Sequence, residues 1–189
     1  MQMKFFLYEE AKKLQFEMPD IVRAYENQDY SFIEKVKTWL SAVEDLLKKY
    51  QMAEVSNISS LKGTLISVER GLIPSDILFK GRSTPKKIRQ ASALKIANDV
   101  NNILNEMVGA FNLKLNEAVT LARQLFAIAS QKGLLAKFES IQDLNVKQKA
   151  IISVINNDPE LNPWIVKLNS IMGIYESQII LDKTLSEFI

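Results

Sequence analysis

The sequence predicts an all-α fold, a helical bundle of about six to eight helices around one long central helix. Apolar residues recur at steps of three and four along most of the chain, which is the spacing of one helix face. Residues that start and stop helices bracket these segments, and no alternating run of β-branched residues predicts a strand. A chain of 189 residues can bury a sufficient core without a disulfide or a structural metal.

Residues 1–71 are predicted to form an N-terminal helical subdomain, which opens with two helices separated by a proline. The first helix is expected over residues 2–16. Pro19 should interrupt it, because proline lacks the N–H that the helix needs. Asp20 can then cap a short helix that ends near Tyr25.

Two further helices complete this subdomain. Ser31 with Glu34 three residues later matches a capping box, which predicts a helix that ends near residue 50. Its apolar residues form a packing seam at steps of three and four: Val36, Trp39, Val43, Leu46 and Tyr50. A helix from about Ala53 is expected to end at Gly71, because glycine readily adopts the left-handed conformation of a helix stop.

Residues 72–83 are predicted to be an apolar linker. Large apolar side chains surround Pro74 in it: Leu72, Ile73, Ile77, Leu78 and Phe79. Such side chains are usually buried, so we expect them to lie in the core of the bundle. Contact with a partner protein is the alternative.

The central helix is predicted over residues 84–131. Thr84 is a good cap and Pro85 suits the first helical position, whereas Gly133 is a natural stop. Apolar residues line two faces of this segment, which predicts helices packed on both sides of it. A straight helix of this length would measure about 70 Å, which exceeds a compact domain of this size. Either the helix is interrupted near 109–112, where a bend is expected rather than a full break, or the molecule is elongated.

Residues 84–189 are predicted to form a C-terminal helical subdomain that shares one core with the first. Short helices are expected over 134–141 and 146–155, followed by a turn at 156–159. A last helix should run from Pro163 to the end, with a seam of Ile165, Leu168, Met172, Tyr175 and Ile179.

Composition argues against most catalytic chemistry. The chain contains neither histidine nor cysteine, which excludes the usual zinc ligands and Ser-His or Cys-His nucleophilic sites. A carboxylate magnesium site would need converging acidic residues, and only Glu106 and Glu117 fall near one helix face. We therefore expect no catalytic residue, no metal and no cofactor.

Positive charge is concentrated in one segment. Residues 80–97 contain six basic residues and no acidic one, whereas 1–79 contain 10 basic and 12 acidic residues and 98–189 contain 8 and 10. The candidate residues for binding an anion or a partner are Lys80, Arg82, Lys86, Lys87, Arg89 and Lys95. Cations in a first helical turn oppose the helix dipole by about 0.3–1 kcal/mol each, and a bound anion would reverse that cost. Solvent, the acidic N-terminal third, an acidic protein and a nucleic-acid backbone are the occupants left open.

We therefore expect a non-enzymatic helical-bundle subunit or adaptor that acts through protein–protein association in a larger cytoplasmic complex. A homo-oligomer is compatible with the long apolar seams. The alternative is an accessory subunit that binds nucleic-acid phosphates without sequence specificity through residues 80–95. No membrane is expected, because no apolar stretch approaches the roughly 18 residues that a span requires. Glu9 and Glu10 close the short apolar N-terminus, which argues against a signal peptide.

Overall fold

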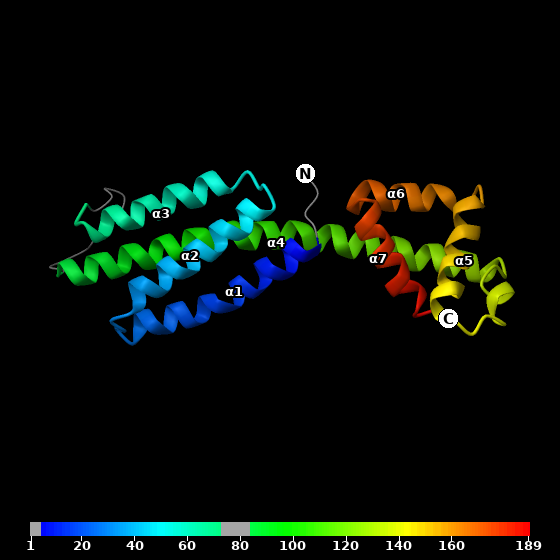
Figure 1. The fold of residues 1–189 in the computed structure, drawn as a ribbon, viewed down its shortest axis with the longest axis horizontal. Coiled ribbons are helices and arrows are strands. Elements are labelled where there is room, and N and C mark those ends of the chain that lie inside the picture. The colour runs from blue at the N-terminus through cyan, green and yellow to red at the C-terminus, as the bar shows by residue number, and fades with distance from the viewer. Residues whose placement is uncertain (1–4, 73–83) are drawn as a thin grey trace. The chain divides into compact units, whose positions relative to one another are not determined.

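The protein is all-helical in the residues that its computed structural model describes, 5–72 and 84–189 (Figure 1). These residues form seven α-helices and one short 3-10 helix, and they contain no strand. The predicted fold class is therefore confirmed. None of the described helices combines the length and the apolar character needed to cross a lipid bilayer.

The chain divides into two compact units, residues 5–109 and 110–189. The boundary lies inside one helix, whereas the sequence suggested a division at residues 72–83. Most of that segment, residues 73–83, lies outside the described residues, so its role as a linker stays a prediction.

The unit 5–109 contains α1 (Phe5–Glu26), α2 (Phe32–Lys49), α3 (Val55–Glu69) and the first half of α4 (Pro85–Gln131). Helices α1 and α3 both pack against α2. The residues predicted for the α2 seam are buried, except for a partly exposed Tyr50. The largest fully buried side chains of the unit are apolar and come from all four helices: Leu7, Phe32, Leu40, Leu47, Ile58, Leu65 and Leu104.

Helix α1 continues through Pro19, so the predicted interruption is wrong. Proline in a helix interior removes one hydrogen bond and costs about 3 kcal/mol. Buried residues on both sides of it, Met18, Ile21 and Ala24 among them, keep one continuous packed face. Burial of Met18 and of Ile21 contributes about 1.5–3 kcal/mol each, which offsets the cost of the proline.

Helix α2 begins after Ser31 as predicted, but the capping box does not form. The Ser31 hydroxyl donates to the Asp29 carboxylate at 2.9 Å. The Glu34 carboxylate accepts from Lys37 at 3.0 Å. A carboxylate is a stronger acceptor than a hydroxyl, so Asp29 organises this turn instead.

Helix α4 is one helix of 47 residues and continues without interruption through 109–112. Its predicted start is confirmed, because the Thr84 hydroxyl accepts from the Lys87 backbone N–H at 3.3 Å. Its predicted stop is confirmed too. Gly133 has a φ of 67°, and its N–H bonds to the carbonyl of Ser130 at 2.8 Å.

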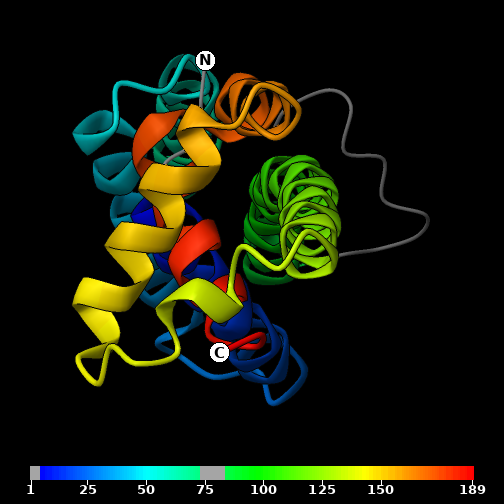
Figure 2. The same cartoon turned by 90° about the vertical axis from the view of Figure 1, so that its right-hand side faces the viewer.

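The unit 110–189 contains the second half of α4, the 3-10 helix η1 (Ala136–Phe138), α5 (Leu144–Asn157), α6 (Asn162–Met172) and α7 (Ile174–Leu185). Figure 2 shows α5, α6 and α7 on one side of this half of α4. The core includes Phe126, Ile151, Ile155 and Leu161.

Two predicted helices of this unit are corrected. Only η1 forms in the segment 134–141. The expected last helix is two helices, because Gly173 has φ 95° and ψ 159°, a conformation that only glycine adopts readily. The break changes the phase of the seam, so Tyr175 is 63% exposed. Residues Ile180, Leu181 and Leu185 are buried in its place.

Two glycines, Gly109 inside α4 and Gly133 just after its end, should respond in opposite ways to replacement by alanine. A Cβ at Gly109 or Gly133 would meet no atom within 4 Å, so only the backbone conformation matters. Gly133→Ala should lower the free energy of unfolding by about 1–2 kcal/mol, because its left-handed conformation strains alanine. Gly109→Ala, inside the helix, should raise it by about 0.5–1 kcal/mol. Urea denaturation of both variants measures these changes, and a loss at Gly109 would argue against helix there.

Candidate functional site

The basic segment predicted as a binding site begins at the N-terminus of α4. Lys86 and Lys87 are exposed in the first turn, and Lys95 is exposed further along the helix. Lys80 and Arg82 lie outside the described residues.

Lys86 and Arg89 both make contacts within their own unit. The Lys86 ammonium lies 4.3 Å from the ring centroid of Tyr30, in the turn between α1 and α2. The Arg89 guanidinium approaches the backbone carbonyl of Glu69, in the last turn of α3, at 3.5 Å. A cation near the C-terminus of a helix is stabilised by the helix dipole, so this contact is favourable for Arg89 and for α3. Part of the basic charge therefore connects α4 to its neighbours.

The predicted apolar contact surface is represented by a single described residue. Leu72 follows the α3 stop and is 68% exposed. Ile73, Ile77, Leu78 and Phe79 lie outside the described residues, so this surface stays a prediction. In the described part of the chain, no group of three or more acidic residues could hold a metal ion, and Glu106 and Glu117 are both exposed.

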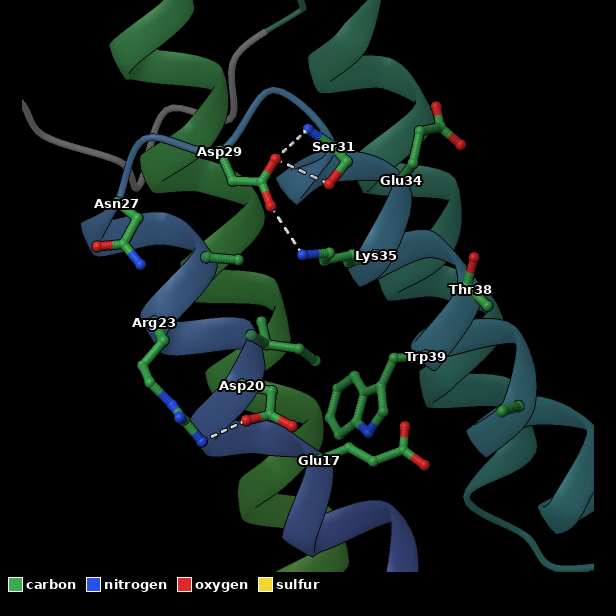
Figure 3. Close-up of a pocket in the computed structure, with 13 residues that line it drawn as sticks. Glu17, Asp20, Arg23, Asn27, Asp29, Ser31, Glu34, Lys35, Thr38 and Trp39 are labelled. Carbon is green, nitrogen blue, oxygen red and sulfur yellow. Dashed lines mark hydrogen bonds and ion pairs between the residues drawn. The ribbon is translucent and has the colours of Figure 1, made fainter.

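A groove that the sequence did not predict runs between α1 and α2 (Figure 3). This α1–α2 groove has a volume of about 1000 Å³. Its floor is apolar and includes the buried residues Ile21, Ala24 and Trp39. Charged and polar side chains from both helices and from the intervening turn form its walls, as Figure 3 shows.

Trp39 positions the two walls relative to each other. Its side chain is only 3% exposed, and its ring lies between the two helices in Figure 3. Its indole N–H donates to the backbone carbonyl of Leu14 at 2.9 Å, which connects α2 directly to α1. A buried indole needs such a partner, so this bond fixes the orientation of the ring.

The α1–α2 groove carries an excess of negative charge. Its lining contains four carboxylates, from Glu17, Asp20, Asp29 and Glu34, against two cations, from Arg23 and Lys35. Arg23 pairs with Asp20, and Lys35 pairs with Asp29 at 2.7 Å. Glu34 pairs with Lys37, which does not line the groove, at 3.0 Å. Among the described residues, Glu17 is therefore the carboxylate of the walls without an ion pair.

Asp29 is ionised over the whole physiological pH range. Its pKa is lowered from 3.8 to about 2, mainly by the hydrogen bond from Lys35 and next by those from the Ser31 backbone and hydroxyl. The Asp29 carboxylate accepts from the Ser31 N–H at 2.9 Å. It thus orders the turn at one end of the groove while remaining negative.

A second groove lies between α1 and α4 in the same unit, with a volume of about 590 Å³. Carboxamide side chains line this α1–α4 groove: Gln15, Asn98, Asn101 and Asn105. The sequence contained one signal for it, since the three asparagines recur at steps of three and four on one helix. Neither groove could be located from sequence alone, because each depends on which helices become neighbours.

Comparisons with protein-family models, with curated proteins and with solved structures give no match to this chain. The functional proposal below therefore rests on the fold and on the α1–α2 groove.

Proposed function

We propose that the protein is a non-enzymatic helical subunit or adaptor that acts through protein–protein association, and that the α1–α2 groove contacts a basic partner segment. The observation that carries this proposal is the groove itself, with its apolar floor and its excess of carboxylates. A partner helix with one apolar face and basic edges would complement both features.

The resolved pKa shifts of the described residues come from ion pairs within the protein. The resolved shifts of carboxyl pKa values are downward, as at Glu44 and Asp158, and those of lysine pKa values are upward, as at Lys48 and Lys132. In each case the first cause is a hydrogen bond to an oppositely charged side chain. Such shifts stabilise the charged forms, whereas a general acid or base needs a pKa near the working pH. The cytoplasmic location expected from the sequence stays a prediction.

Charge reversal in the groove tests the proposal. Glu17→Lys with Glu34→Lys reverses the charge of two carboxylates of the walls without touching the floor. Wild-type protein should retain partner proteins from a lysate of its source cell. The double variant should retain at least about tenfold less of them. The matched control is Glu106→Lys with Glu117→Lys, which makes the same charge change at exposed positions of α4. Equal retention by both double variants, or no partner for wild type, would contradict the proposal.

The phosphate-binding alternative is supported by Lys86 and Lys87, whose side chains are exposed at a helix start. It predicts binding to a mixed-sequence duplex that weakens with salt, by about 0.9 log units per tenfold salt for each phosphate contacted. Lys86→Glu with Lys87→Glu should abolish this binding, whereas Lys147→Glu with Lys149→Glu should not. Arg89 is left unchanged because it also contacts α3. Fluorescence anisotropy measures the affinities, and absence of wild-type binding at low salt would exclude this function.

A further inference from the structure

Opposite charges lie at the two ends of the α1–α2 groove. Asp29 and Ser31 line one end of it, in the turn between α1 and α2. Between them in the sequence, Tyr30 has the Lys86 ammonium 4.3 Å from its ring centroid, so the basic start of α4 lies beside this end. Glu17 lines the other end, as Figure 3 shows. Its carboxylate is exposed and makes no ion pair with a described residue.

The lysines of the α4 start cannot reach Glu17 of their own copy. The Gln15 side chain donates to Asn105 at 2.7 Å, so α4 lies alongside α1 and runs in the opposite direction. Glu17, two residues after Gln15, is therefore close to the level of Asn105. The helix rises about 28 Å between Lys86 and Asn105, which is several times the length of a lysine side chain. A contact between these two charged sites requires a second copy of the chain.

Both sites have features that such a contact would satisfy. Lys86 and Lys87 are exposed, and neither makes an ion pair with a described residue. The helix dipole opposes cations in a first turn, and a carboxylate from another molecule would remove that cost. An exposed aromatic side chain lies beside each site: Phe16 next to Glu17 is 73% exposed, and Tyr30 is 94% exposed. Aromatic residues are enriched at protein interfaces, so these two rings offer apolar surface for association.

We propose that two copies of the chain associate about a two-fold axis, with the α4 start of each copy against the Glu17 end of the other copy's α1–α2 groove. Lys86 and Lys87 of one copy then pair with Glu17 of the other. A two-fold interface needs one surface that carries both complementary sites, and the unit 5–109 provides it. Both contacts form at once, which favours a second copy over an unrelated basic segment. This inference rests on the proposed function, because it names the basic segment that the groove contacts.

Charge reversal followed by mixing tests this dimer. Glu17→Lys places lysine against lysine, and Lys86→Glu with Lys87→Glu places carboxylates against Glu17. Each variant alone should dimerise at least about tenfold more weakly than wild type. An equimolar mixture of the two restores opposite charges at both contacts and should dimerise as tightly as wild type. Glu9→Lys is the matched control, because Glu9 is exposed on α1 and does not line the groove. Sedimentation velocity at low and moderate salt measures the affinities, which should fall with salt.

Cross-linking of the wild type covers the case in which a variant folds poorly. A carbodiimide joins a carboxylate to an amine in contact with it. A mixture of isotopically labelled and unlabelled protein should therefore give a cross-link between Glu17 of one kind and Lys86 or Lys87 of the other. The dimer is overturned if the protein is monomeric up to about 1 mM at low salt, if mixing restores nothing, or if the cross-links between copies join other residues.

Failure of the dimer and failure of the proposed function give different results. A monomer that still retains lysate proteins through Glu17 and Glu34 would overturn the dimer and leave the adaptor function standing. A dimer that passes both tests, while wild type retains no other protein from the lysate, would support the dimer and contradict the adaptor function.

Discussion

Replacing Trp39 with alanine is expected to lower the free energy of unfolding by about 3–5 kcal/mol. The ring is almost fully buried between α1 and α2, so its removal leaves a cavity and exposes apolar surface on both helices. The same change deletes the hydrogen bond to the Leu14 carbonyl. Urea denaturation followed by circular dichroism measures the loss.

Trp39→Phe separates packing from hydrogen bonding. Phenylalanine keeps most of the buried ring surface but has no N–H, so the Leu14 carbonyl loses its indole donor. We expect a loss of about 1–2 kcal/mol for this variant. The chain has two tryptophans, so Trp164 in the other unit then serves as the only fluorescent reporter. A loss for Trp39→Ala below about 1 kcal/mol would contradict the position of this ring in the core.

The start and stop of α4 could be predicted because local chemistry decides them. Thr84 supplies an acceptor to a nearby N–H, and Gly133 supplies a left-handed conformation, whatever the rest of the chain does. The failures come from tertiary contacts that outweigh a local preference. Burial along α1 overrides the helix-breaking tendency of Pro19, and Asp29 competes successfully for the Ser31 hydroxyl.

The candidate sites were less predictable than the fold. Charge counting found the basic start of α4, but it could not show that Lys86 contacts Tyr30 or that Arg89 approaches the end of α3. Both grooves combine residues from α1 with residues from another helix. Asn101 is one of many polar residues along α4, and only its neighbours in space show that its side-chain oxygen has no donor among the described residues.

Glu44 is expected to be the most important ionised side chain for the stability of the unit 5–109. It is buried on α2, and its carboxylate accepts from Ser59 at 2.7 Å and from Lys62 at 2.9 Å, both on α3. Lys48 pairs with it at 2.8 Å. These bonds connect the two helices, so Glu44→Ala should cost about 2–3 kcal/mol at pH 7. Asp45→Ala, at the exposed neighbouring position, should change stability by less than about 0.5 kcal/mol.

The contribution of Glu44 should also depend on pH in a defined direction. Its pKa is lowered from 4.5 to about 2, first by the hydrogen bond from Lys48 and then by those from Lys62 and Ser59. A carboxyl whose pKa is lower in the folded protein stabilises the fold when it is ionised. The stability difference between wild type and Glu44→Ala should therefore be constant above about pH 5.5 and shrink as the pH falls from about 4.5 towards 2. Urea denaturation of both proteins at several pH values measures this difference directly, because the other carboxyl groups titrate in both. If the difference stayed constant down to pH 3, Glu44 would stabilise the helices by packing, and the charged bonds to α3 would contribute little.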